Sequence, residues 1–375
     1  LARTKSVQSF KSDFPDLEAR IIAAIGSVGP RNIAQISRLT GAHQETVRYQ
    51  IKKRLARLGF KFHAEVDHRK IGLAQHWATL HFSRPYYNSA TKLLDTMNRV
   101  GYLTYYTKVL PQGRFLAIFS LPVGTTEEFR TLLSHLVDNK ILTGFSLDEA
   151  LVSRHPSMNP RFFNFRSGRW EVEWNKVTSQ GRSPLQAEKQ ASEASPDHYD
   201  LLLIKELQKD AMQHTVGIAR KQKVHGKTLE YHYRSHVMKE KMVPSFFVRW
   251  TRDIEKKPVH SVDTTRLTFK NLSQGEYTRV QRAVSKIPYL WAEDLLKDGT
   301  YIATLHVPVY DLIPTFSYLN DEVGELDGNL ETNFLKPNES HLYTIPHHMF
   351  VKDRWEFNIA AMETAVAKAA ALVEK

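Results

Sequence analysis

The sequence predicts an α+β protein that is a tandem duplication, each half being a winged helix-turn-helix followed by a ferredoxin-like (βαββαβ) module. Three observations lead to this prediction: an internal repeat, a run of short helices that starts each half, and a strand-helix-strand-strand-helix-strand order after each run. The 375 residues are 42% hydrophobic and 11% aromatic, which supplies real cores and excludes wholesale disorder. We expect the two ferredoxin-like modules to pair within the chain as a pseudo-dimer.

The internal repeat joins the two halves at a nearly constant offset. An offset of 182 residues superposes the apolar positions of the first helices without a gap, as for Ile21 with Leu203 and Ile36 with Ile218. Further along, the offset lies between 185 and 187, and the matches are Tyr102-Leu103 with Tyr289-Leu290, Gly113 with Gly299, Ala117 with Ala303, Pro122 with Pro308 and Arg169-Trp170-Glu171 with Arg354-Trp355-Glu356. Such agreement over a whole half predicts a duplication.

Domain boundaries follow from this repeat and from composition. We predict a first winged helix over 14–73, a first ferredoxin-like module over 74–176, a linker over 177–196, a second winged helix over 197–258, a second ferredoxin-like module over 259–357 and a C-terminal helix over 358–375. The linker is rich in Ser, Gln, Glu and Ala, which is typical of a flexible connection. The Ala-rich C-terminal helix has small residues that suit close packing, against the body or against a second chain.

Three short helices and a wing are predicted at the start of the first half. Residues 16–25 place apolar side chains on one face, as an amphipathic helix requires. Asn32 is a plausible N-cap for a second helix that ends at Gly41. A third helix runs over 44–58 and stops at Gly59, and the alternating pattern of 60–66 indicates a short two-stranded wing.

The ferredoxin-like order follows in each half. In the first half we predict strands over 77–82, 102–110, 114–121 and 144–151, with helices over 90–100 and 126–137. The turn Pro111-Gln112-Gly113 joins the two central strands as a hairpin. The second half repeats the order over 265–330, with Lys297-Asp298-Gly299 as the turn.

Positive charge is concentrated on the third helix of each half. The net charge of the chain is +12, and residues 31–61 carry eight basic residues against one acidic, residues 214–249 eight against two. Such clustering favours a polyanionic partner, and we predict double-stranded DNA. The predicted DNA-binding residues are Arg38, His43, Gln44, Thr46, Arg48, Tyr49, Lys52, Lys53, Arg54 and Lys61 in the first half, and Arg220, His225, Lys227, Thr228, Tyr231 and Arg234 in the second.

These positions divide by the contact that each is expected to make. The start of a recognition helix meets base edges, so Gln44 and Arg48 are assigned to adenine and guanine, whereas Lys53 and Arg54 are assigned to phosphates. The halves differ, since Arg48 corresponds to Glu230, so we expect them to read unlike half-sites of an asymmetric operator. The alternative is that the basic helix is a solvated face or binds protein.

A family resemblance rests on the end of the first winged helix. The stretch Glu45-Thr46-Val47, Ile51, Leu55, Leu58-Gly59-Phe60, Ala64-Glu65-Val66-Asp67 and Ile71-Gly72-Leu73 resembles the Lrp/AsnC family of transcriptional regulators. The resemblance implies that the third helix enters the major groove and that the ferredoxin-like domain assembles dimers and binds a small effector. The family's Gly-x-Tyr-Asp run is absent, because the matching positions read Gly113-Arg114-Phe115-Leu116 and Gly299-Thr300-Tyr301-Ile302. The effector and a homodimer of chains are therefore left open.

Enzymes that resemble this family give the alternative interpretation. Siroheme decarboxylases are similar to Lrp/AsnC proteins and act through His and Arg in a tetrapyrrole pocket. In this chain Arg161, Arg166 and His155 are the candidates for such a role. Because catalysis gives no reason for a basic third helix, the main prediction is a regulator that is not an enzyme and needs no cofactor.

Other kinds of site are predicted to be absent. The chain has no Cys, which excludes disulfides, thiolate catalysis and Cys-ligated metals. His232 and His236 have the i, i+4 spacing of a helical metal pair, but no third ligand is apparent in the sequence, so we predict no metal and a surface or DNA-facing role. No apolar run approaches the length of a membrane span, and a cytoplasmic protein is expected.

Overall fold

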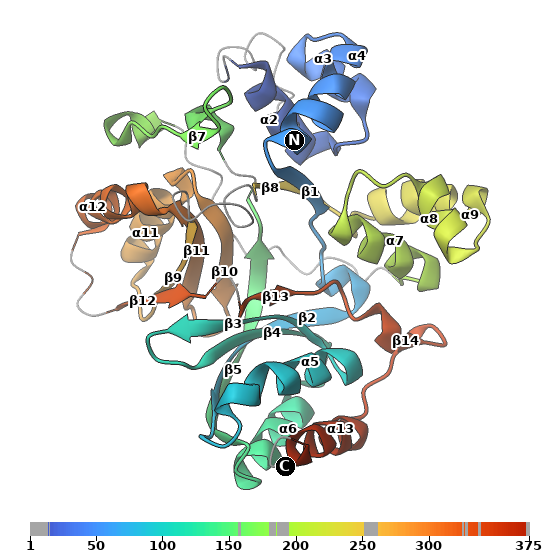
Figure 1. The fold of residues 1–375 in the computed structure, drawn as a ribbon, viewed down its shortest axis with the longest axis vertical. Helices are drawn as coiled ribbons and strands as arrows, with labels where there is room; N and C mark the ends of the chain where they lie inside the picture. The colour runs from blue at the N-terminus through green and yellow to red at the C-terminus, as the bar shows by residue number, and fades with distance from the viewer. Residues whose placement is uncertain are drawn as a thin grey trace.

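The computed structural model describes residues 14, 16–156, 159–179, 185, 195–250, 262–324, 326, 329–336 and 339–372. Most of the predicted linker, 180–184 and 186–194, lies outside the described residues. Figure 1 shows two helical lobes above and beside a large curved sheet that carries helices on its outer side. In the described part of the chain, no helix has the length and apolarity needed to cross a membrane.

The first winged helix has the three predicted helices. They are α2 (Leu17–Val28), α3 (Ile33–Thr40) and α4 (Gln44–Tyr49), and α4 continues through wider, π-type turns over Gln50–Leu55. The Asn32 side chain accepts a hydrogen bond from the Gln35 amide, and Gly41 ends α3 in the left-handed conformation, as predicted. Ile21, Ile25 and Ile36 are fully buried between these helices.

The second winged helix repeats this arrangement, and its first helix has a side-chain cap that the first helix of the other copy lacks. Its helices are α7 (His198–Lys209), α8 (Thr215–Gln222) and α9 (Gly226–His232), and α9 continues over Tyr233–Met238. Asp197 and Asp200 form a reciprocal capping box at the start of α7. The helices therefore superpose on those of the first half at the offset of the sequence repeat.

The wing differs from the prediction. In the described residues each half supplies one wing strand rather than two, β1 (Phe60–Ala64) and β8 (Phe246–Trp250), and these pair with each other antiparallel. A lone strand leaves its backbone groups unpaired, and the strand of the other copy satisfies them. Gly29, with φ of +79°, lets the Phe246 ring approach its backbone, because a Cβ there would lie 2.7 Å from that ring. The two winged helices thus form one unit.

Both ferredoxin-like modules have the predicted element order. The first consists of β2 (Leu73–Phe82), α5 (Ala90–Val100), β3 (Leu103–Leu110), β4 (Phe115–Pro122), α6 (Thr126–Asp138) and β5 (Leu142–Arg154). The second consists of β9 (Val262–Phe269), α11 (Gln274–Lys286), β10 (Leu290–Leu296), β11 (Tyr301–Pro308), α12 (Leu312–Val323) and β12 (Leu330–Leu335).

The two modules close into an eight-stranded barrel. The strand order is β12-β9-β11-β10-β5-β2-β4-β3, and β12 also pairs with β3, which closes the ring. The modules meet twice, at β10–β5 and at β12–β3, so the expected pairing within one chain is present. The barrel interior holds apolar side chains such as Leu116 and Ile302, and the Arg266 guanidinium lies 4.4 Å from the centre of the Trp77 ring.

A short hairpin follows each module and crosses to the other one. We call residues 159–174 the first arm, with β6 (Phe163–Asn164) and β7 (Arg169–Trp170), and residues 345–357 the second arm, with β14 (Phe350–Val351) and β15 (Arg354–Trp355). Trp170 packs on Tyr289 of the second module, and Trp355 packs on Tyr102 of the first. Each hairpin contains the Arg-Trp-Glu match of the internal repeat, with Arg and Trp on its second strand.

Two further elements complete the fold. β13 (His341–Leu342), which precedes the second arm, pairs with β3 at Tyr105 and Tyr106. The C-terminal helix α13 (Ile359–Ala371) packs on α5 and α6 (Figure 1), which favours the body over a second chain as its partner.

Candidate active site

The first arm is shaped by its own side chains. Asn159 caps the turn Pro160–Phe162, where its side chain accepts a hydrogen bond from the Arg161 amide. Asn164 accepts from the backbone amides of Arg166 and Ser167 and so closes the tight turn between β6 and β7. This geometry leaves Arg161 and Arg166 exposed while the Phe163 ring between them in sequence is buried.

An aromatic wall holds the first arm against the paired wing strands. Phe163 is 3% exposed, and its ring centre lies 5.2 Å from Trp170 and 5.1 Å from Trp250, both edge-on. The Phe60 ring of β1 approaches Phe163 in the same geometry at 5.2 Å. Edge-to-face pairs of this kind contribute about 0.5–1.5 kcal/mol each beyond burial. The wall therefore fixes the arm between the winged helices and the second module.

A polar cavity of about 500 Å³ opens in front of this wall. It is lined by Asp16, Glu18, Arg54, Arg161, Phe162, Phe163, Asn164, Phe165, Arg166 and Glu171. Arg54 and Glu18 form an ion pair of 2.9 Å between nitrogen and oxygen, with Glu18 only 8% exposed. Asn164 and Ser167 donate hydrogen bonds to Glu171. Arg161 and Arg166 are thus the two exposed guanidinium groups of the cavity, and guanidinium groups bind carboxylates with two parallel hydrogen bonds.

Behind the wall lies a cluster of histidine and aromatic rings. His155 stacks on Phe247 at 4.9 Å and meets the edge of Trp291 at 5.6 Å, and Trp291 stacks on His306 at 4.6 Å. A small cavity of about 20 Å³ adjoins these rings, and Trp170 and Trp250 of the wall also line it. A space of this size suits one water molecule.

The pKa values of the two histidines in this cluster are shifted in opposite directions. Burial disfavours the charged form of His155, but the Glu65 carboxylate, 3.2 Å from Nδ1, outweighs it and raises the pKa of His155. Burial and the charge of Arg249 lower the pKa of His306 to about 3. Neighbouring groups whose pKa values are driven apart are a common arrangement for a proton donor and an acceptor.

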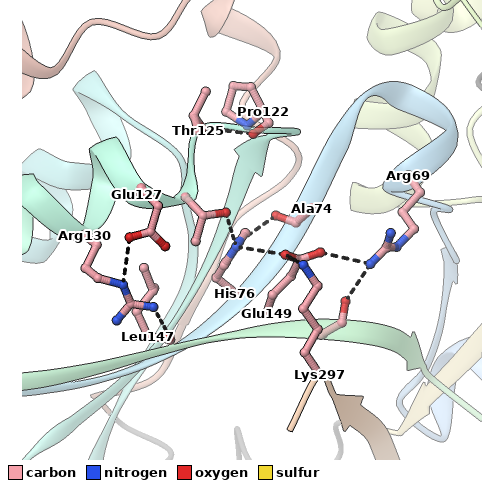
Figure 2. Close-up of polar contacts among 12 residues, drawn as sticks. Arg69, Ala74, His76, Pro122, Thr125, Glu127, Arg130, Leu147, Glu149 and Lys297 are labelled. Atoms are coloured by element: carbon pink, nitrogen blue, oxygen red, sulfur yellow. Dashed lines mark hydrogen bonds and ion pairs between the residues drawn. The ribbon is translucent and has the colours of Figure 1, made fainter.

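A second polar cluster lies beside α6 on the outer side of the sheet (Figure 2). His76 is buried, its Nε2 lies 3.0 Å from the Thr126 hydroxyl, and burial lowers its pKa. Glu149 forms an ion pair of 3.0 Å with Arg69 and another with Lys297 of the second module. Because its charges are paired within the cluster, we interpret it as a connection between the modules.

The predicted DNA-binding residues lie on the outer faces of the two winged helices. Exposed are Arg38, His43, Gln44, Thr46, Tyr49, Lys52, Lys53, Lys61, Arg220, His225, Lys227, Tyr231 and Arg234, and partly buried are Arg48, Arg54 and Thr228. Arg48 pairs with Glu45 and Arg234 with Glu230 on the same helices. Arg54, predicted to contact phosphate, instead lines the polar cavity.

The proposed surface role of the histidine pair is wrong for one member. His232 is 8% exposed, and its Nδ1 lies 2.9 Å from the buried Asp200 carboxylate. Asp200 was not predicted as a partner of this histidine, because it precedes His232 by 32 residues and reaches it only when α7 packs on α9. Glu65, Trp291 and His306, which come from three separate segments, were not predicted as site residues either. His155, Arg161 and Arg166 were predicted as candidates for an enzyme site.

Comparison with known proteins identifies the fold. No family model matches the chain, and no curated protein matches it in sequence. Two solved structures match nearly the whole chain, both of the siroheme decarboxylase NirDL. One matches with a TM-score of 0.53 over 96% of this chain and 100% of that chain. The other, in co-complex with an iron-uroporphyrin III analogue, matches with a TM-score of 0.54 over 95% and 99%, and each is 7% identical in sequence.

These matches confirm the Lrp-like fold and correct one prediction. We predicted a protein that is not an enzyme, and that prediction is wrong, because the fold over the whole chain is the fold of an enzyme. A basic third helix in the winged helix does not exclude catalysis elsewhere in the molecule.

Proposed function

We propose that this chain is an enzyme that binds a carboxylate-bearing tetrapyrrole and removes carboxylate from it as carbon dioxide. The observation that carries the proposal is the polar cavity of about 500 Å³ with Arg161 and Arg166 at its edge, backed by the aromatic wall. The volume falls within the range of about 300–1,000 Å³ of small-molecule sites. The fold shared with a siroheme decarboxylase supports the reaction class.

The binding chemistry follows from the shape of the ligand class. A tetrapyrrole such as siroheme has a flat apolar ring with carboxylate groups around its rim. Arg161 and Arg166 are suited to those carboxylates, and Phe162 and Phe165, which also line the cavity, are suited to the ring. Arg54 is already paired with Glu18, so we assign it to shaping the cavity rather than to binding.

The reaction requires one proton for each carboxylate lost. The bond between the side-chain carbon and the carboxylate breaks, carbon dioxide leaves, and the electron pair left on carbon takes up a proton. We assign the supply of that proton to His155, because Glu65 favours its charged form. The small cavity lined by Pro156, Trp170 and His306 gives room for one water molecule behind the wall.

The test measures binding and product with siroheme and with iron-uroporphyrin III. We expect a shift of the visible absorption band on binding, and product that has lost the mass of carbon dioxide from siroheme. The Arg161→Ala, Arg166→Ala double variant should weaken binding about 10- to 100-fold, since a hydrogen bond to a charged group contributes about 1.5–3 kcal/mol and exposure reduces it. Arg169→Ala is the matched control, because Arg169 is exposed on the same hairpin outside the cavity.

Two outcomes would contradict the proposal. The first is that neither compound shifts the absorption band of the purified chain. The second is that Arg169→Ala weakens binding as much as the double variant does. His155→Gln should leave binding intact and lower the rate of carbon dioxide loss, which separates its assigned role from a structural one.

A second candidate function, DNA binding by the winged helices, is favoured by one specific observation. Tyr49 is 57% exposed and Tyr231 59% exposed at equivalent places on the two recognition helices, surrounded by exposed basic residues. Each tyrosine thus presents its hydroxyl beside basic groups on the helix that would enter the major groove, where Tyr side chains can donate to phosphate oxygens. The affinity for duplex DNA across a salt series tests this candidate. The slope of log K against log salt should be shallower in the double variant Arg48→Ala, Lys52→Ala than in the parent chain. Absence of binding at low salt would exclude this candidate.

A further inference from the structure

We propose that the second winged helix binds a divalent transition-metal ion of the zinc class through His232, His236, Asp200 and Asp197. The two histidines come from α9 and its continuation, and the two aspartates from the start of α7. The four ligand atoms lie within 4.8 Å of one another. This inference concerns a different part of the molecule from the proposed catalytic cavity and does not depend on it.

The distances match those between ligands around one ion. Nδ1 of His232 lies 2.9 Å from Oδ1 of Asp200 and 3.4 Å from Oδ2 of Asp197, and Nδ1 of His236 lies 3.2 Å from Oδ2 of Asp200. Zinc–nitrogen and zinc–oxygen bonds of about 2.0–2.2 Å in a tetrahedron place neighbouring ligand atoms roughly 3.3–3.5 Å apart. The cluster therefore needs only small shifts to receive an ion.

The charges around the cluster also favour a bound cation. Asp200 is fully buried, and a buried carboxylate requires a positive partner. In the first winged helix the equivalent Glu18 has that partner in Arg54. At the offset of 182, Arg54 corresponds to His236 and Gln50 to His232. Two imidazoles thus stand where the first copy has an amide and a guanidinium, and imidazole with carboxylate is a donor set that binds zinc and related ions.

The surroundings suit a site that a small ion can reach. The rings of Tyr199 and Tyr231 pack against His232 at 5.2 and 5.6 Å and hold the imidazole in place. The side chains of Asp197 and His236 are 39% and 34% exposed, so one side of the cluster is open to solvent. The bound ion would connect α7 to α9 and thereby stabilise the second winged helix.

The experiment is a titration of the untagged, metal-free full chain with Zn²⁺. Calorimetry measures the binding, and thermal unfolding measures the melting temperature with and without the ion. Co²⁺ is a second probe, because a tetrahedral site gives it strong visible absorption. We expect one Zn²⁺ per chain, a rise in melting temperature and no comparable effect of Mg²⁺ or Ca²⁺, which prefer oxygen ligands.

The variants are chosen to preserve folding. Asp197→Asn keeps the helix cap, since Asn caps as well as Asp, but removes an anionic ligand. His236→Gln changes a partly exposed side chain. Each should weaken Zn²⁺ binding by about 100-fold or more, because even outer partners of a metal site contribute about 10- to 100-fold. His225→Gln, at an exposed histidine that begins α9, is the matched control and should bind as the parent does.

Two results would overturn the proposal. One is the absence of saturable Zn²⁺ binding by a chain whose circular dichroism shows it to be folded. The other is binding that Asp197→Asn and His236→Gln leave unchanged, or that His225→Gln weakens equally. The cluster would then be a set of hydrogen bonds between Asp200 and two imidazoles.

Discussion

The first and the second winged helix begin from the same arrangement and differ where each meets its arm. Beside the first, Arg161 and Arg166 border an open cavity of about 500 Å³. Beside the second, the arm lies directly on the helix: the Ile345 amide donates to the Gln208 side chain at 2.8 Å, and His347 meets His198 at 4.7 Å between ring centres. Duplication supplies two equivalent interfaces, and the side chains at each give the first its polar cavity and the second its polar contacts between arm and helix.

The same contrast holds for the buried acid under each arm. Glu18 forms its ion pair with the guanidinium of Arg54, a group that does not bind metal ions. Asp200 is contacted instead by the imidazoles of His232 and His236, and imidazole with carboxylate is a donor set suited to a metal ion. The first half thus has a closed ion pair beside its cavity, whereas the second has a set of potential metal ligands.

The largest expected effect comes from removing the central ring of each arm. Phe163→Ala should lower the free energy of unfolding by about 3–5 kcal/mol, because a buried ring with four aromatic neighbours leaves a large cavity. Phe350→Ala, at the equivalent place in the second arm, should lower the free energy of unfolding by clearly less. The Phe350 ring is 8% exposed and packs edge-to-face on Trp355. Urea unfolding measures both, and equal losses would show that the two arms are docked alike.

The next effect concerns the two buried acids. Asp200→Asn should lower the free energy of unfolding by about 2 kcal/mol, since it removes the partner of both His232 and His236. Glu18→Gln should cost about 1 kcal/mol or less, because the Arg54 side chain is 36% exposed and water can solvate it. Both are measured by urea unfolding with a chelator present. A larger loss for Glu18→Gln would reverse the comparison.

The sequence predicted what local pattern determines. Apolar spacing at Ile21, Ile25 and Ile36 located helices, and Asn32 and Gly41 marked the ends of one of them. The order of elements then indicated the ferredoxin-like modules, and the repeat indicated their pairing. Each of these features depends on residues that are close in sequence or on a comparison of whole segments.

Long-range contacts account for what was not predicted. The pairing of β1 with β8 joins residues 182 to 190 positions apart, and a single alternating stretch cannot show which strand will pair with it. The cluster of histidine and aromatic rings likewise draws Glu65 and His155 from the loops that follow β1 and β5, and His306 from β11. His232 and His236 were recognised as a pair, but their carboxylates lie on another helix. Such sites require the tertiary fold.

The smallest expected effect is a difference in pH response between the arms. Burial lowers the pKa of His347 in the second arm to about 4, below the ordinary value of about 6.5 in the unfolded chain. The folded state therefore binds fewer protons, so its stabilisation is full above about pH 6.5 and is lost as the pH falls toward 4. At pH 6 we expect the second arm to have lost about 1 kcal/mol of local stability, and more at pH 5. The first arm has no histidine between residues 159 and 174 and should not respond.

Hydrogen exchange at pH 7 and pH 5, corrected for its intrinsic pH dependence, resolves the two arms separately. Protection should fall in residues 345–357 and stay constant in residues 159–174. His347→Phe removes the titrating group while keeping a ring against His198, so it should abolish the pH dependence of the second arm. If both arms lose protection together, the loss arises in the barrel that they share. The lowered pKa of His306 also makes the folded state less stable as the pH falls. The His306→Phe variant, which retains a ring on Trp291, would then flatten the response of both arms.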